Sequence, residues 1–305
     1  MDLAIDGGQT GLRLGLSSSG RVLETREVTG LSYAEGSPVT AILDRIGTGW
    51  GELDTICLGL TMLVDAPTAL TDRLLSIARR VLLTTDVVTS HAGAFAGGDG
   101  VVLAAGTGAI ALGVRAPHPH HGALDGPEAV QVDGWGFLYG DAGSGFWIGS
   151  RGMDAAFRGH DGRAEPGPLT ARAREVFGEL NGLPRRLYLS SDAVARVARF
   201  AVHVFELAAH DATARAIVTS AGAELAGTVT AAARDFPEGT AVPVAWTGRL
   251  LRDQTLRDAF EAELARLLPR AHLAPAAGDS LAGAAFLAAA TDLGPYRSLV
   301  MEAHR

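Results

Sequence analysis

The alternation of apolar and polar positions predicts that the chain opens with three short strands and continues with helices and strands in turn. Each strand stops at a cluster of turn-forming residues. Ser37-Pro38 supplies an N-cap followed by proline at the first helical position, which predicts the start of a helix. The predicted elements are strands at 3–6, 12–16 and 21–28, a helix from 37 to about 46, a strand at 55–60, a helix at about 69–80, a strand at 81–83 and a helix at 87–96. Their order is βββαβαβα.

The same order of elements returns after residue 100, in pattern rather than in residue identity. This second copy differs by a long helical insertion in its first helical position. Its predicted elements are strands at 100–105, 109–115 and 129–132, the helical region 144–234, a strand at 242–246, a helix at 254–267, a strand at 271–273 and a helix at 280–290. Two such halves predict an α/β protein with a central cleft, and ligands of α/β sheets bind at strand ends beside such clefts.

Composition excludes several classes of protein. The 305 residues include 47% hydrophobic and 20% charged residues with a net charge of −8, which are ordinary globular values without a basic stripe for nucleic acid. A single cysteine, Cys57, excludes a disulfide framework, an iron–sulfur cluster held by several thiolates and a cysteine-rich zinc site. With neither a secretory signal nor an apolar run of about 18 residues, we expect a cytoplasmic protein that does not bind a membrane.

The absence of lysine excludes further chemistry. All 26 basic residues are arginine. P-loop enzymes and protein kinases need a lysine on the phosphates of their nucleotide, and Schiff-base enzymes need a lysine amine. These classes are therefore ruled out, and any nucleotide site must rely on other groups.

Two glycine-rich turns stand at matching places in the two halves. IDGGQTG, residues 5–11, and AAGTGAIA, residues 104–111, each follow a first strand. Small residues and a threonine in such a turn can aim N–H groups and a hydroxyl at a phosphate, although one such turn alone is more often an ordinary hairpin turn. Asp6, at the end of the first strand, could hold Mg²⁺ through water. The candidate phosphate-binding residues are Gly7, Gly8, Gln9, Thr10, Gly106, Thr107 and Gly108.

Asp86 ends a predicted strand and faces the predicted cleft. A carboxylate in this place can accept the proton of a hydroxyl group as its oxygen attacks the γ-phosphoryl group of a nucleotide. An aspartate before an apolar helix is also a common N-cap. From the residues alone both roles stay open, and they can coexist.

A third cluster carries a more specific resemblance. The stretch DGWGFLYGDAGSGFWIG, residues 133–149, resembles the GGWG…GDEGS…WIG stretch of N-acetylglucosamine kinases in the BadF/BadG/BcrA/BcrD-type ATPase family. LLTTD, residues 82–86, resembles the strand end that carries the catalytic aspartate of those kinases, and the spacing from Asp86 to Gly106 agrees. The two turns and the element order resemble the wider sugar kinase/Hsp70/actin superfamily. The resemblance covers the whole chain.

The resemblance implies a fold of two ribonuclease H-like βββαβαβα halves facing a central cleft. It implies an N-terminal domain over 1–114 and a C-terminal domain over 115–285, with a C-terminal helix at about 286–303 packing back on the first domain. The implied activity is ATP-dependent phosphorylation of an amino sugar, foremost N-acetylglucosamine to its 6-phosphate, with ATP and Mg²⁺ as cofactors. A homodimer is a further expectation of the same kind.

The resemblance also assigns roles to single residues. Asp86 becomes the catalytic base, and Gly248 lies in the loop that lets adenosine approach. The residues implied to bind the sugar are Ser32, Gly134, Trp135 and Asp141. Asp141 could instead cap the helix near 144, and Trp135 could instead pack in the core.

Two departures from the family pattern leave the acceptor sugar open. The glutamate of GDEGS is Ala142 here, and Glu35 follows a loop where we expect an asparagine. Glucosamine and N-acetylmuramate are therefore alternatives. A non-catalytic sugar or nucleotide sensor on the same fold is a second class, which the presence of Asp6, Asp86 and Asp141 disfavours. A dehydratase-activating ATPase needs cluster-binding cysteines that the chain lacks. His118, His120 and His121 could bind metal, but a surface loop is the favoured interpretation.

Overall fold

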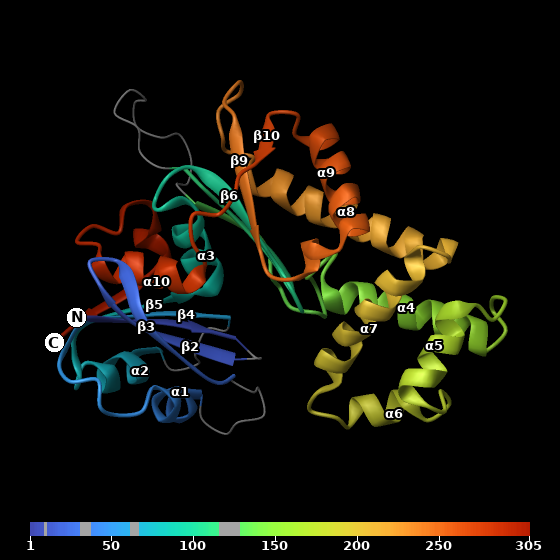
Figure 1. Cartoon of the computed structure of the whole chain (residues 1–305), viewed down its shortest axis with the longest axis horizontal. Helices are drawn as coiled ribbons and strands as arrows, with labels where there is room; N and C mark the ends of the chain where they lie inside the picture. The colour runs from blue at the N-terminus through green and yellow to red at the C-terminus, as the bar shows by residue number, and fades with distance from the viewer. Residues whose placement is uncertain (9–10, 31–37, 62–66, 116–128) are drawn as a thin grey trace.

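Two β-sheets form the framework of the protein (Figure 1), in a computed structural model that describes residues 1–8, 11–30, 38–61, 67–115 and 129–305. Among these residues, the first sheet has the strand order β11-β5-β4-β1-β2-β3 and the second β10-β9-β6-β7-β8. The first sheet comprises β1 (Asp2–Gly7), β2 (Gly11–Ser18), β3 (Arg21–Thr29), β4 (Leu53–Leu60), β5 (Ala78–Thr85) and β11 (Met301–His304). The second comprises β6 (Gly100–Ala105), β7 (Ala109–Val114), β8 (Ala129–Asp133), β9 (Val242–Thr247) and β10 (Ala271–Leu273).

The two sheets share one topology, which confirms the predicted repeat. In each, the first strand pairs antiparallel with the second and parallel with the fourth. The second strand pairs antiparallel with the third, and the fourth pairs parallel with the fifth. Parallel pairing places the ends of β1 and β4, and of β6 and β9, at the same edge of each sheet, where their turns meet. The fold class is therefore α/β with two matching halves.

Helices cover the sheets in three groups (Figure 1). Helices α1 and α2 pack on the first sheet. Helices α4 to α8 form a bundle that, together with α9, extends the second half. Helices α3 and α10 pack against each other and against both halves. The helices are α1 (Pro38–Ile46), α2 (Pro67–Leu74), α3 (Asp86–Phe95), α4 (Gly145–His160), α5 (Pro168–Phe177), α6 (Leu183–Tyr188), α7 (Ala193–Ala208), α8 (Ala212–Ala232), α9 (Gln254–Leu267) and α10 (Ser280–Ala289). The described residues also form the 3₁₀ helices η1 (Leu250–Arg252) and η2 (Gly294–Leu299).

Helices α3 and α10 cross with their backbones in contact. A Cβ atom on Gly93 would lie 2.1 Å from the carbonyl oxygen of Asp279, and one on Gly283 would lie 1.8 Å from that of Thr89. Only glycine permits such an approach. Nearby, the buried ring of His91 lies 2.8 Å from the Tyr296 hydroxyl through Nδ1 and 3.0 Å from the Gly100 carbonyl through Nε2. The crossing joins the two halves and brings the first turns of both helices to the same cleft.

The C-terminal segment differs from the predicted helix at about 286–303. Helix α10 ends at Ala289, and the chain continues through η2 into β11, which pairs antiparallel with β5 at the edge of the first sheet. Pro295 cannot donate a backbone hydrogen bond within a longer helix. The segment does return to the first half, but as an edge strand and a 3₁₀ helix rather than as a continuous α-helix.

Two other boundaries also differ from the predictions. Strand β5 begins at Ala78 rather than at 81, because Ala78 and Arg80 already pair with Leu53 and Thr55 of the parallel strand β4. Strands β6 and β7 belong to the second sheet, so strand pairing starts the second half at Gly100 rather than after residue 114. Cys57 is buried in β4, and burial raises the pKa of its thiol to about 12, as expected for an inert core cysteine.

Candidate active site

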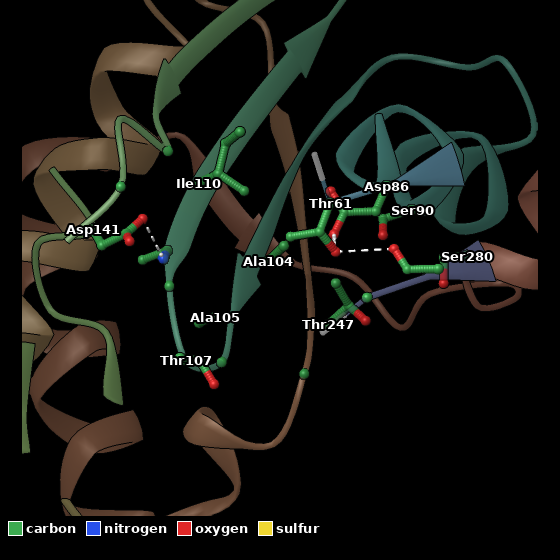
Figure 2. Close-up of a pocket in the computed structure, with 18 of the residues that line it drawn as sticks. Thr61, Asp86, Ser90, Ala104, Ala105, Thr107, Ile110, Asp141, Thr247 and Ser280 are labelled. Carbon is green, nitrogen blue, oxygen red and sulfur yellow. Dashed lines mark hydrogen bonds between the residues drawn. The ribbon is translucent and has the colours of Figure 1, made fainter. Parts of the chain in front are cut away.

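A cleft of about 1050 Å³ contains every predicted site residue that the structure describes (Figure 2). Its walls come from the end of β1, the start of α3, the β6–β7 turn, the loop after β8 and the end of β9. The predicted residues that line it are Asp6, Gly7, Gly8, Asp86, Gly106, Thr107, Gly108, Gly134, Trp135, Asp141 and Gly248. The predicted residues Gln9, Thr10 and Ser32 lie outside the described residues, as do Glu35, His118, His120 and His121.

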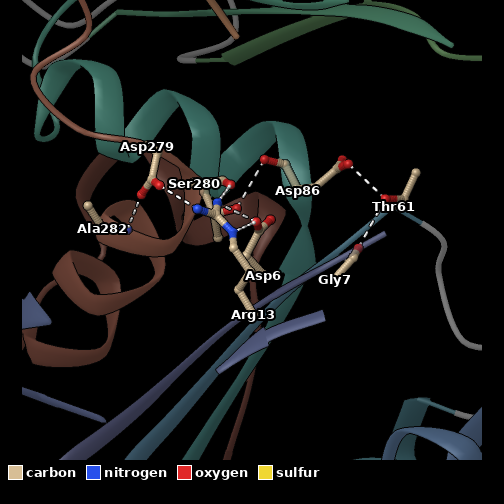
Figure 3. Close-up of polar contacts among 9 residues, drawn as sticks. Asp6, Gly7, Arg13, Thr61, Asp86, Asp279, Ser280 and Ala282 are labelled. Atoms are coloured by element: carbon tan, nitrogen blue, oxygen red, sulfur yellow. Dashed lines mark hydrogen bonds and ion pairs between the residues drawn. The ribbon is translucent and has the colours of Figure 1, made fainter. Parts of the chain in front are cut away.

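Asp86 is the first residue of α3 and not its cap. The N-cap position is Thr85, and the Asp86 carboxylate is turned to the cleft, where its Oδ2 lies 2.9 Å from the Thr61 hydroxyl (Figure 3). That hydroxyl also lies 3.0 Å from the Gly7 carbonyl, so its one proton serves one acceptor at a time. Burial raises the pKa of Asp86, the Thr61 hydrogen bond opposes that rise, and the charge of Asp6 adds to it. A carboxylate with a raised pKa is a better proton acceptor near neutral pH.

An arginine joins the carboxylates on one side of the cleft. The Arg13 guanidinium donates from Nε and Nη2 to Asp6 at 3.0 and 2.6 Å, and from Nη1 to Asp279 at 2.6 Å (Figure 3). Its Nη2 also donates to the Ser280 hydroxyl at 3.1 Å. The other Asp279 oxygen caps α10 by accepting the Ala282 N–H at 3.0 Å. Arg13 thus holds the mostly buried Asp6 and the half-exposed Asp279 beside the first turn, and it links β2 to the start of α10.

Backbone lines the cleft where the turns of the two halves meet. The Gly8 N–H donates to the Gly11 carbonyl, and the Gly106 N–H donates to the Gly108 carbonyl, so a backbone hydrogen bond joins β1 to β2 and β6 to β7 at each turn. Gly248 has φ +93°, and a Cβ there would lie 2.2 Å from the Ala105 carbonyl oxygen. The loop after β9 therefore lies directly against the end of β6, which only glycine allows. Such bare backbone suits a nucleotide and its phosphates.

Asp141 lies across the cleft from Asp86 (Figure 2). Its Oδ1 accepts the Ala109 N–H at 3.2 Å, and burial raises the pKa of its carboxyl group. The cap of α4 is Ser144, whose hydroxyl accepts the Trp147 N–H at 3.1 Å, so Asp141 does not cap that helix. Trp135 is 73% exposed and lines the cleft, which excludes a place in the core. The geometry leaves the Asp141 carboxylate free to meet a polar ligand from one side.

The donor set beside the first turn fits a magnesium ion that arrives on nucleotide phosphates. In the parts of the chain described by the structure, no three His, Cys, Asp or Glu side chains converge on one metal position. Asp6 is a single, mostly buried carboxylate beside the Gly7–Gly8 backbone, with Arg13 already bound to it. Mg²⁺ is commonly held by one or two carboxylates together with substrate phosphates. Asp6 is thus the residue that would orient the ion.

Comparison with known proteins assigns the chain to a family. The model of the BadF/BadG/BcrA/BcrD ATPase family matches residues 5–283. The chain belongs to this family. It is 27% identical over 127 residues to an N-acetylmuramic acid/N-acetylglucosamine kinase of Clostridium acetobutylicum, an alignment that spans 40% of this chain and 39% of that relative.

Solved structures share the fold over nearly the whole chain. A protein of Chromobacterium violaceum assigned as an N-acetylglucosamine kinase is 28% identical, with a TM-score of 0.72 and coverage of 94% of this chain and 98% of that one. A ROK family glucokinase from Streptomyces griseus, solved with glucose and AMPPNP, is 17% identical, with a TM-score of 0.56 and coverage of 94% and 97%. This second likeness concerns the fold alone. Among the described residues of this ATPase family member, no helix is long and apolar enough to span a bilayer.

Several polar residues of the cleft are absent from the predictions made from sequence. They are Arg13, Thr61 and Ser280, together with Asp279 as the ion-pair partner of Arg13. Asp133, which accepts the Asp141 N–H from outside the cleft lining, is also absent from the predictions. Arg13 carried a usable signal, because the hairpin turn after Asp6 places it directly opposite on β2. Asp279 carried no signal in the sequence as a partner of Arg13, since 266 residues separate the two.

Proposed function

We propose that this chain transfers the γ-phosphoryl group of ATP to a hydroxyl of an amino sugar, foremost the 6-hydroxyl of N-acetylglucosamine. The observation that carries the proposal is the Asp86 carboxylate, which is turned into the cleft with a raised pKa, opposite Asp141 and beside the two glycine turns. Family membership and the kinase names of the relatives support it. Because the reaction consumes ATP, we place it in the cytoplasm; the homodimer stays a prediction.

Each group then has one task. The two turns and the Gly248 loop hold ATP through backbone N–H groups, and Asp141 binds sugar hydroxyls. Asp86 accepts the proton of the attacking hydroxyl, which makes its oxygen a better nucleophile. Asp6 would orient a magnesium ion that arrives with the nucleotide, and the ion would neutralise phosphate charge there. Full turnover in excess chelator would contradict the role given to Asp6.

One feature of the cleft favours glucosamine as a second candidate acceptor. Carboxylates line the described part of the cleft from both halves, at Asp6, Glu27, Asp86 and Asp141, against the single guanidinium of Arg13. Arg13 is already bound to Asp6, whereas Glu27 lies exposed on β3. A surplus of negative charge attracts an ammonium group and gives nothing to a neutral N-acetyl group.

A screen of acceptors tests the proposal. ATP consumption is measured with N-acetylglucosamine, glucosamine, N-acetylmuramate, N-acetylmannosamine and glucose, and the product is located by NMR. We expect the highest kcat/KM with N-acetylglucosamine and phosphorylation at its 6-hydroxyl. Preference for glucosamine would select the second candidate. Binding of sugar and ATP without turnover of any acceptor would point to a sensor and overturn the kinase proposal.

The raised pKa of Asp86 predicts an unusual acid limb in the pH profile of kcat. The base works only when deprotonated, so activity is lost as pH falls through its pKa. Because burial raises that pKa, the loss begins at a higher pH than an ordinary aspartate, with a pKa of about 3.9, would give. Thr61→Val removes the hydrogen bond that favours the charged form and is expected to move the limb further upward.

The measurement is kcat against pH for both proteins, with both substrates saturating. A limb in the same place in the wild type and in Thr61→Val would contradict the contribution of the Thr61 hydrogen bond. A limb at the pH of an ordinary aspartate would contradict Asp86 as a buried base.

A further inference from the structure

The backbone at Asp133, the last residue of β8, adopts a conformation that few residues other than glycine adopt. Its φ is +64°, in the left-handed region. The family stretch that this segment resembles begins with GGWG, whereas this chain reads DGWG. Glycine would take this conformation without strain, whereas aspartate adopts it at a cost that contacts of its carboxylate can offset.

The Asp133 carboxylate accepts three backbone N–H groups. Its Oδ1 accepts from Gly134 at 2.8 Å and from Asp141 at 2.7 Å, and its Oδ2 accepts from Ala142 at 3.0 Å. The first donor is the next residue, but the other two are eight and nine residues away. One side chain therefore closes the whole loop from 134 to 141 at its base.

The absence of a side chain at residue 140 leaves room for the Asp133 carboxylate. A Cβ atom on Gly140 would lie 2.3 Å from the Asp133 Oδ1, so the carboxylate fills the position that a side chain at residue 140 would need. Asp141 itself has φ +58°, a second left-handed residue held by its N–H bond to Asp133. This backbone orientation sends the Asp141 carboxylate to the Ala109 N–H on the β6–β7 turn.

We propose that Asp133 is a positioning residue whose carboxylate clasps the loop 134–141 and aims Asp141 at the bound sugar. The inference rests on the proposed function in that it takes Asp141 as the sugar ligand. The clasp has two consequences. It fixes the Asp141 backbone before any ligand arrives, and it keeps the exposed side chains of Trp135, Leu138 and Tyr139 at the mouth of the cleft.

Two variants separate the carboxylate from the backbone strain. Asp133→Gly keeps the left-handed conformation easily but removes the clasp. Asp133→Asn keeps one oxygen, which can still accept from the N–H groups of Gly134 and Asp141, and turns an amide N–H₂ toward Ala142. Ser19→Gly is the matched control, since Ser19 has φ +51° in the β2–β3 turn and is absent from the cleft lining. It relieves strain of the same kind without touching the loop.

The first readout is hydrogen exchange of the free protein over residues 134–142. We expect exchange at Asp141 and Ala142 to rise about 10-fold in Asp133→Gly, to rise less in Asp133→Asn, and to stay unchanged in Ser19→Gly. This readout needs no substrate, so it tests the clasp even if no acceptor is ever phosphorylated. Unchanged exchange in Asp133→Gly would overturn the proposal.

The second readout is steady-state kinetics with the acceptor identified by the screen. The KM for the acceptor is expected to rise about 10-fold or more in Asp133→Gly while the KM for ATP stays within about 2-fold, because misplacing one ligand-binding group by a fraction of an ångström weakens only the contacts it makes. A purely structural role would lower the thermal midpoint and leave the ratio of the two KM values unchanged. Faster exchange with an unchanged acceptor KM would therefore reject the positioning role and leave the kinase proposal standing.

Discussion

Asp86→Asn is expected to lower turnover at least about 10²-fold while leaving the fold and ATP binding intact. Asparagine has the same shape and can still accept the Thr61 hydroxyl proton through its amide oxygen. It cannot take up a proton from a sugar hydroxyl near neutral pH, so the attacking oxygen loses its base. The measurements are kcat with saturating substrates, ATP affinity by calorimetry, and the thermal midpoint.

Asp154→Asn on α4 is a control for the removal of one carboxylate. Asp154 is half exposed and pairs with Arg158 one turn along the same helix, away from the cleft, so turnover is expected to stay near that of the wild type. If Asp86→Asn retains nearly full turnover, then Asp86 serves only the start of α3, and the proposed base is wrong.

The second large effect concerns stability. Gly93→Ala is expected to lower the free energy of unfolding by about 1–3 kcal/mol or more, the usual cost of overpacking. The new Cβ would lie 2.1 Å from the Asp279 carbonyl oxygen, which is backbone and cannot rotate away. Helices α3 and α10 must therefore separate, which also moves the first turns of both helices in the cleft. Urea unfolding followed by circular dichroism measures the effect.

Gly227→Ala on α8 is the matched control. A Cβ there meets nothing within 4 Å, so the substitution is expected to raise stability by about 0.5–1 kcal/mol through the ordinary helix preference of alanine. Equal changes in the two variants would show that the close crossing of α3 and α10 does not exist in solution.

Local pattern was enough to predict most of the fold. The strands Asp2–Gly7 and Gly100–Ala105 are short apolar runs that stop at glycine, and recognising both as first strands of a repeat gave the order of elements. The sheet orders confirm that repeat. Matching turns then led to one cleft, where the predicted residues that the structure describes come together. The roles of those residues stay predictions.

The predictions that were wrong, and the contacts that were missed, depend on residues far apart in the sequence. Arg80 stands in a run that also suits a helix, but Ala78 and Arg80 pair with the distant strand β4, and Arg80 also binds Glu302 near the end of the chain. The end of the chain is apolar enough for a helix, but the open edge of β5 offers backbone partners that draw β11 into the sheet. The hydrogen bond from Arg13 to Asp279 also joins distant residues, and the sequence around either residue does not predict the other as its partner.

The position of α10 and β11 has a consequence for the order in which the protein folds. The second half is continuous from β6 to β10, whereas the first half lacks an edge strand and a covering helix until the end of the chain is available. The hydrogen bond between His91 and Tyr296 likewise cannot form until Tyr296 has been synthesised. During synthesis, the second half can therefore form its core while the first half, although translated earlier, still exposes the apolar face that α10 will cover. The half translated first is completed last.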